Sequence, residues 1–277
     1  MCFITWNVSP EIFHFGTFSL HWYGLLFAGG FVLGYFIMRK IFRQEDVPLK
    51  LLDRVTWYMI FGTLIGARLG HCLFYEPEYF LKNPLEILLP IARDIHGTYQ
   101  FVGFQGFASH GAALGILAAL YIFSRVERQP YIWVLDRMSI VAALSCSLIR
   151  LGNLFNSEIY GRSTGLPWGF KFVRSPEWQQ APVFAQPCHP TQIYEALAYL
   201  VIFACLCRMY FKNEKTKSGV LFGIFLISMF TVRFLIEFLK LEQVGFEKGM
   251  LLNMGQLLSI PFILYGIYLF RKTMISP

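Results

Sequence analysis

Seven long apolar runs constrain the fold of this chain more than any other feature. Each is long enough to cross about 30 Å of hydrocarbon as a helix. The runs cover residues 20–38, 56–75, 107–124, 132–149, 191–211, 219–239 and 254–270. Only 15% of the residues are charged, whereas a soluble domain carries about a quarter. We therefore predict an all-α polytopic membrane protein with about seven transmembrane helices, in which residues 1–277 form a single integral-membrane domain.

The positions of lysine and arginine predict how the chain is oriented. Fourteen of the 24 lie in short connections on one side, namely 39–55, 125–131 with the adjoining Arg137, 208–218 and the C-terminal tail. The longer alternate segments hold fewer. The positive-inside rule therefore places the N-terminus outside and the C-terminus in the cytoplasm. Segments 76–106 and 150–190 would then lie on the outer surface, the second as a small proline-rich cap. This pattern explains the net charge of +7 without a nucleic-acid partner.

The polar residues of the predicted spans gather near the outer ends. They are His21, Tyr23, Arg68, His71, His110, Arg150, His189, Gln192, Tyr194, Glu195, Arg233 and Glu237. At 1.5 Å rise per residue, all fall within about 10 Å of the outer hydrocarbon boundary. A transporter or channel needs polar groups at the midplane and beyond. The sequence instead favours a one-sided pocket that opens to the outer leaflet.

Three arginines in this layer, Arg68, Arg150 and Arg233, imply an anionic ligand. Each buried arginine costs about 2.5–3.5 kcal/mol on insertion scales, and a phospholipid head group is the anion available at that depth. The alternative is a set of structural arginine–glutamate pairs. Arg233 and Glu237, four residues apart, are the best candidates for such a pair. We expect that pair to form and Arg150 to be left for the ligand.

The segment from Arg150 to Gly161 begins where the fourth apolar run meets polar sequence. A guanidinium offers a planar donor fork suited to phosphate, and Asn153 and Asn156 offer neutral amide donors. Gly152 and Gly161 would let the backbone bend or let a head group come close. This pattern indicates an anion site at a membrane surface. The alternative is a polar helix cap with an interfacial arginine.

His110 is the candidate base. It is flanked by Gly106 and Gly111 and shares the depth of the arginines. An imidazole with a pKa near 6.5 is a suitable base for a thiol with a pKa near 8.5. The alternative is a capping or interface histidine at the end of a span. The sequence contains no GxSxG, HExxH or P-loop motif, and a basic pocket would repel a metal ion, so we expect neither metal nor cofactor.

These segments resemble the prolipoprotein diacylglyceryl transferase family. The pattern Arg150-x-Gly-Asn153-x-x-Asn156-x-Glu158-x-x-Gly161 matches that family's diagnostic motif. Four further segments match in the family's order: His21-Trp22-Tyr23-Gly24, His110-Gly111, His189-Pro190-Thr191-Gln192-Ile193-Tyr194-Glu195 and Arg233-Phe234-Leu235-Ile236-Glu237. One departure is Met229, where many members carry a tyrosine.

The resemblance implies a multi-pass enzyme of the bacterial cell (inner) membrane whose active site faces the outer leaflet. Such an enzyme moves the diacylglyceryl group of phosphatidylglycerol onto the lipobox cysteine thiol of an exported prolipoprotein, bound through its signal peptide. The products are a thioether and glycerol phosphate, in the first step of lipoprotein maturation. The other class of function is a non-enzymatic scaffold or scramblase that binds anionic phospholipids. It would need the arginines but not His110.

The resemblance also implies roles for individual residues. His110, Arg150 and Arg233 would be catalytic, His110 as base and the arginines on the phosphate with help from Asn153. Glu158 and Glu195 would orient the arginines. The substrate-binding residues would be Tyr23, Arg68, Gly111, Asn153, Asn156, Glu158, Gly161, His189, Glu195 and Glu237.

Overall fold

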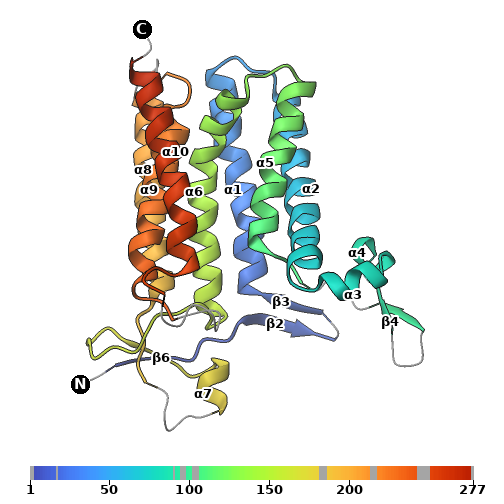
Figure 1. Ribbon diagram of the computed structural model, residues 1–277, viewed down its shortest axis with the longest axis vertical. Helices are drawn as coiled ribbons and strands as arrows, with labels where there is room; N and C mark the ends of the chain where they lie inside the picture. The colour runs from blue at the N-terminus through green and yellow to red at the C-terminus, as the bar shows by residue number, and fades with distance from the viewer. Residues whose placement is uncertain are drawn as a thin grey trace. The chain divides into compact units, whose positions relative to one another are not determined.

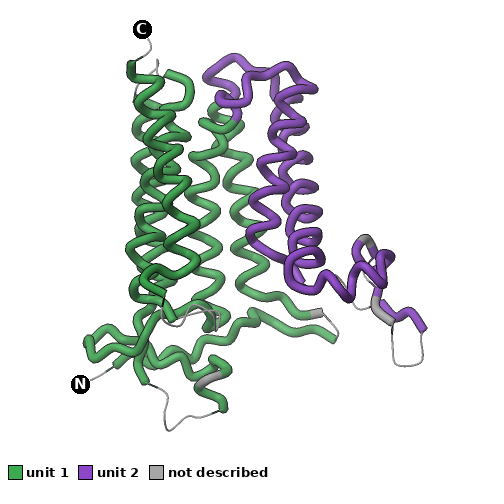
Figure 2. Tube along the Cα trace, in the orientation of Figure 1, with its two compact units in different colours: residues 1–41, 135–277 green, residues 42–134 purple. Residues whose placement is uncertain are grey.

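The computed structural model describes residues 3–16, 18–89, 91–93, 98–101, 106–180, 186–212, 217–241 and 250–275. The chain divides into two compact units, shown in Figure 2. The first comprises Met1–Ile41 and Leu135–Pro277, and the second comprises Phe42–Val134. Most residues that the sequence singles out belong to the first unit.

Long helices occur at all seven predicted places (Figure 1). They are α1 (Trp22–Gln44), α2 (Leu49–Phe74), α5 (Ser109–Val126), α6 (Tyr131–Phe155), α8 (Thr191–Lys212), α9 (Val220–Glu237) and α10 (Met254–Ile275). Within the described residues, six of them are long and apolar enough to cross a membrane, all except α2. The 26 residues of α2 would extend about 39 Å, but the helix carries charged side chains near both ends. The predicted class, an all-α polytopic membrane protein, is confirmed.

Helix α6 is longer than the fourth apolar run predicts. The run ends at Ile149, whereas α6 continues to Phe155. Two aromatic contacts hold the added turns: the Trp6 indole donates to the Leu154 carbonyl at 3.0 Å, and Trp22 stacks on Phe155 with ring centroids 4.8 Å apart. Arg150 therefore projects from a helix rather than from a loop, so its backbone position is fixed.

Short elements complete the chain. Three are helices: α3 (Pro77–Lys82), α4 (Leu85–Leu88) and α7 (Pro176–Gln180). Six are strands that form three two-stranded ribbons: β1 (Ile4–Trp6) parallel to β6 (Phe170–Phe172), β2 (Glu11–Phe15) antiparallel to β3 (Phe18–His21), and β4 (Ile91–Arg93) antiparallel to β5 (Tyr99–Phe101). In the first unit, the β1–β6 ribbon lies beyond the end of α6 that carries Arg150 (Figure 1).

The segment predicted to be a small cap has an apolar core of its own. Leu154, Phe170 and Phe172 are buried together. Other hydrophobic side chains pack around them, namely Trp6, Tyr160, Cys188 and Ile193. Because Leu154 belongs to α6, this cluster ties the ribbon directly to the helix that carries Arg150.

In the second unit, α2 and α5 are in backbone contact along a row of glycines. A Cβ built on Gly66 would lie 2.5 Å from the Gly111 carbonyl oxygen, and one on Gly115 would lie 2.2 Å from that of Gly62. Real Cβ atoms do not approach backbone so closely. Small residues at four-residue spacing allow this approach between membrane helices.

At the end of the first unit away from Arg150, a buried aspartate fixes the start of α9. Asp136 of α6 is 1% exposed and accepts hydrogen bonds from the backbone N–H groups of Gly219 at 2.6 Å and Phe222 at 2.8 Å. These N–H groups lack partners within the helix, and the aspartate satisfies them. The contact ties α6 to the start of α9.

Candidate active site

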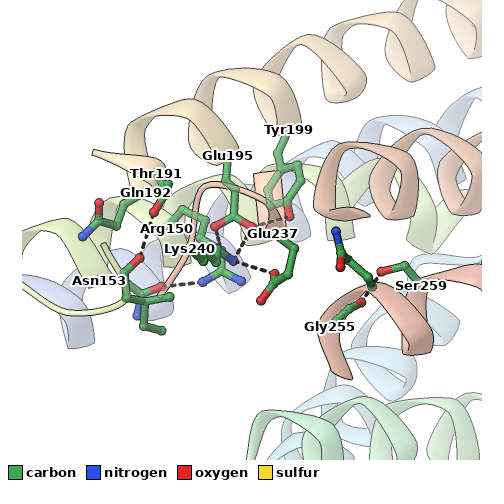
Figure 3. Close-up of polar contacts among 12 residues, drawn as sticks. Arg150, Asn153, Thr191, Gln192, Glu195, Tyr199, Glu237, Lys240, Gly255 and Ser259 are labelled. Carbon is green, nitrogen blue, oxygen red and sulfur yellow. Dashed lines mark hydrogen bonds and ion pairs between the residues drawn. The ribbon is translucent and has the colours of Figure 1, made fainter. Parts of the chain in front are cut away.

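Arg150 lies at the centre of a polar cluster formed by the ends of the first unit's helices (Figure 3). Its Nε atom is 3.0 Å from the Glu195 carboxylate, and its Nη1 donates to Asn153 Oδ1 at 3.2 Å. The Asn153 amide in turn donates to Glu158 Oε1 at 2.8 Å. The Asn153 side chain therefore links Arg150 to Glu158. The hydrogen bond places Asn153 beside Arg150, and its role as a donor to the ligand stays a prediction.

The turn that follows α6 is secured against the start of α8. Asn156 donates a second hydrogen bond to Glu158 Oε1 at 3.1 Å. Gln192 donates to the Glu158 carbonyl at 2.7 Å, and the Thr191 hydroxyl donates to the Ile159 carbonyl at 3.0 Å. Gln192 and Thr191 are both 0% exposed. Glu158 reaches Arg150 only through Asn153, so its predicted orienting role is indirect here.

Glu195 is a buried carboxylate shared by three donors. Oε2 faces Arg150, whereas Oε1 lies 3.0 Å from Lys240 Nζ and accepts from the Tyr199 hydroxyl at 3.3 Å. Lys240 Nζ also lies 3.3 Å from Glu237 Oε2. Arg150, Glu195, Lys240 and Glu237 thus alternate in charge and sum to zero. Glu195 Oε2 and Glu237 Oε2 make no aligned hydrogen bond, so their contacts with the cations are ion pairs held by charge and distance.

The expected pairing of Arg233 with Glu237 is wrong. Among the described residues no ion pair joins them, and Glu237 pairs with Lys240 instead. Glu237 is the last residue of α9, where the chain turns and brings Lys240 back over the helix end. The arginine with a buried carboxylate partner is Arg150, the one we expected to be left for the ligand.

Arg150 and Arg233, the two arginines assigned to the phosphate, lie in the same unit. The positive charges of both Arg150 and Arg233 act on Tyr199 and on Cys146. Arg233 itself is half-buried on α9. Both arginines therefore lie within electrostatic range of Tyr199.

Lys240 is the site residue that sequence reasoning missed. It is 2% exposed, although it comes directly after the sixth apolar run in the sequence. Lys240 follows Glu237 by three residues. This spacing was the available signal for a pair, because side chains three apart at the end of a helix can be neighbours. Its second partner, Glu195, is 45 residues earlier in the chain, and only the fold reveals that contact.

Gly161 explains how Lys240 reaches the cluster. The Gly161 segment runs antiparallel to Lys240, with Arg162 donating from its backbone N–H to the Leu239 carbonyl at 2.6 Å and from Nε to the Lys240 carbonyl at 3.0 Å. A Cβ on Gly161 would lie 2.5 Å from the Leu239 oxygen and 2.8 Å from the His189 Cβ. Any larger residue would push the two segments apart and displace Lys240.

Two further predicted residues lie in the same unit. Tyr23, in the first turn of α1, packs on Gly152, where a Cβ would meet its ring at 2.8 Å. His189 Nδ1 is 3.4 Å from the hydroxyl of Tyr194, which also accepts from the Trp168 indole at 2.9 Å. Tyr23 thus shapes the α1–α6 contact, and His189 belongs to a polar chain at the start of α8.

The second unit contains Arg68, His110 and Gly111. Arg68 donates to the backbone carbonyls of Glu86 and Ile87, and its guanidinium lies 4.8 Å from the centre of the Phe80 ring. His110 is exposed at the second position of α5. Gly111 packs against the backbone of α2, which accounts for a glycine beside the histidine.

Fold and site together define a class: a polytopic membrane protein with an arginine-centred, charge-balanced polar cluster where its helices end. The chain belongs to the prolipoprotein diacylglyceryl transferase family, whose model matches residues 10–271. The family expected from the motifs is thereby confirmed.

Several similar proteins are named phosphatidylglycerol–prolipoprotein diacylglyceryl transferase. The protein from Porphyromonas gingivalis is 44% identical over 99% of this chain and 96% of its own length. The one from Bacteroides fragilis is 42% identical over 96% of this chain and 93% of its own length. A third, from Chloroherpeton thalassium, is 44% identical with the same two coverages of 96% and 93%.

Proposed function

We propose that this protein transfers the diacylglyceryl group of phosphatidylglycerol to the lipobox cysteine of prolipoproteins. The observation that carries the proposal is the family match across nearly the whole chain, which includes every residue of the Arg150 cluster. In the reaction, a sulfur–carbon bond forms to the glyceryl carbon as the bond from that carbon to the phosphate oxygen breaks. The thiol loses its proton, and glycerol phosphate leaves with both bonding electrons.

The arginines suit this chemistry because the leaving group gains charge. The phosphodiester carries one negative charge, and the departing glycerol phosphate carries about two near neutral pH. Arg150 and Arg233 would stabilise the added charge, as preorganised cations and donors do in transition states. Arg233, which has no ion pair among the described residues, would make the first contact with the phosphate. Arg150 is held in position by Glu195 and Asn153.

His110 would accept the proton of the incoming thiol. Its exposed position at the start of α5 leaves the imidazole open to a substrate. The nucleophile comes from the prolipoprotein, so the enzyme needs no nucleophilic side chain of its own.

The proposed place of this reaction is the outer leaflet of the bacterial inner membrane. The charge distribution of the connecting segments supports this orientation. Cysteine labels at Ser163 should therefore react with an impermeant reagent outside intact cells, and labels at Lys217 should not. The reverse pattern would place the Arg150 cluster on the cytoplasmic side, where no exported thiol could reach it.

The decisive experiment uses the purified protein, phosphatidylglycerol and a lipobox peptide with a free cysteine. Mass spectrometry should show the peptide gaining a diacylglyceryl group while glycerol phosphate is released. His110→Asn should still bind phosphatidylglycerol, but its transfer rate should fall by about 100-fold or more. His14→Asn, at an exposed histidine of β2, is the matched control and should transfer normally. Binding of phosphatidylglycerol without any thioether product would instead identify a scaffold or scramblase.

A further inference from the structure

Lys240 is a buried cation whose position needs an explanation. Its side chain is 2% exposed and touches two carboxylates, each from a different helix. An isolated buried lysine is strongly destabilising, and a paired one contributes little net stability. Well-packed apolar residues in place of the whole charged set would serve the fold at least as well. The charge at this position therefore points to a role beyond folding.

The two oxygens of Glu195 divide its partners. Oε2 faces Arg150, and Oε1 faces both Lys240 and the Tyr199 hydroxyl. Since the Glu195 side chain is 0% exposed, water cannot take over from a partner that leaves. If Arg150 turned to an anionic ligand, the carboxylate would still hold a cation and a hydroxyl on its other oxygen.

We propose that Lys240 is a positioning residue that retains Glu195 while a lipid phosphate replaces this carboxylate on Arg150. The inference rests on the proposed function and extends it by one residue. Phosphate and carboxylate both match the guanidinium fork, so they compete for the same donors. Lys240 makes the exchange possible because Glu195 is never left as a buried charge without a partner.

The local backbone supports this assignment. Gly161 and Arg162 hold residues 239 and 240 through backbone contacts that only a glycine at position 161 permits. Glu237, which packs on Gly255 of α10, steadies the ammonium from the far side. Lys240 is thus fixed at both its backbone and its charged end, as a residue that orients another must be.

The test is a set of charge-changing variants measured for both binding and transfer. Without Lys240, Glu195 has only Arg150 as a cationic partner and should hold it against the ligand. Lys240→Met should therefore raise the KM for phosphatidylglycerol by at least about tenfold, with a smaller change in kcat. Lys240→Arg should stay near the wild-type KM. Lys50→Met, at an exposed lysine of α2, is the matched control and should change neither quantity.

Two double variants separate positioning from simple charge balance. Adding Glu195→Gln to Lys240→Met removes the competing carboxylate and should restore binding of phosphatidylglycerol in phosphatidylcholine nanodiscs. Adding Glu237→Gln restores the same net charge but leaves Glu195 on Arg150, so binding should stay weak. In the Lys240→Met/Glu195→Gln variant, no carboxylate at position 195 is left without its lysine. This variant therefore keeps the test valid if Lys240→Met alone does not fold.

Three results would overturn the inference: a normal KM for Lys240→Met, rescue by Glu237→Gln in place of Glu195→Gln, or no recovery of binding with Glu195→Gln. Failure of the proposed function would look different. A wild-type protein that forms no thioether would disprove the activity, whereas an active wild type with an equally active Lys240→Met would remove only the role of Lys240.

Discussion

Arg150 and Arg68 are both arginines near the end of a long helix, but their partners differ in kind. Arg150, in the first unit, contacts side-chain groups, the carboxylate of Glu195 and the amide of Asn153. Arg68, in the second, donates to the backbone carbonyls that end α4. A side-chain partner can move aside for a ligand without unfolding anything. A backbone partner is part of the fold itself.

Asp136 resembles Arg68 because its hydrogen-bond partners are also backbone groups. Its carboxylate is buried and accepts from two backbone N–H groups at the start of α9. The comparison therefore separates charged residues that can exchange partners from those that fix the chain. Substitutions in the first group should change turnover, and substitutions in the second should change stability.

The largest effect is expected from Arg150→Lys. Lysine keeps the charge but loses the planar fork that reaches Glu195 and Asn153 together. Turnover of phosphatidylglycerol should fall by about 100-fold or more, the scale of losing a preorganised donor. In the same initial-rate assay Arg68→Lys should retain turnover within about tenfold of the wild type and mainly lower the melting temperature. Equal losses of turnover in both variants would contradict the distinction between arginines with side-chain partners and arginines with backbone partners.

The next effect concerns Gly111, which the sequence assigned to the substrate and the structure places against α2. A Cβ there would lie 2.3 Å from the Gly66 carbonyl oxygen and 2.6 Å from the Gly70 Cα. Gly111→Ala should therefore destabilise the protein by about 1–3 kcal/mol through overpacking. Gly29→Ala in α1 has nothing within 4 Å of its Cβ and is the matched control. Thermal unfolding in detergent would compare them, and equal melting temperatures would contradict the close packing.

A smaller effect is expected from Asp136→Ala. The variant leaves two backbone N–H groups of α9 without their acceptor, which costs about 0.5–2 kcal/mol, as for other helix caps. The melting temperature should fall, whereas the KM for phosphatidylglycerol, measured well below that temperature, should stay the same. A raised KM would show that the two ends of α9 are coupled.

The smallest effect is expected from Met229→Tyr, which introduces the tyrosine that the family resemblance leads us to expect at this position. Met229 is 8% exposed and lies one turn before Arg233. The hydroxyl of Tyr199 already lies near both arginines, so a second one should change turnover by less than about tenfold. A larger gain would show that the native site lacks a hydroxyl it needs. Initial rates at saturating phosphatidylglycerol would decide.

The helices were predictable from the sequence because a membrane span can be recognised by its length and hydrophobicity. The six-residue extension of α6 beyond Ile149 was not, because it depends on contacts with Trp6 and Trp22, which lie far away in the sequence. The three-residue strands are too short to show a periodic pattern, and each forms only when it pairs with its partner strand. Their existence is a property of tertiary structure.

The site was partly predictable for a similar reason. Motif residues within one segment, such as Asn153 and Glu158, could be grouped from spacing alone. The partner of each charge could not, because helix spacing allows Glu237 to meet either Arg233 or Lys240, and the turn after α9 favours Lys240. The link from Lys240 to Glu195 joins two helices, and no local pattern encodes it.

The pairing of β1 with β6 has a consequence for the order in which the protein is completed. Trp6 donates to the carbonyl of Leu154, 148 residues later, and its strand neighbour is Phe172. A ribosome will have made α1, α2, α5 and most of α6 before Leu154 exists, and all of α6 before Phe172 does. The first strand to be synthesised is thus among the last to be paired, and its docking marks the moment when the beginning and the middle of the nascent chain join.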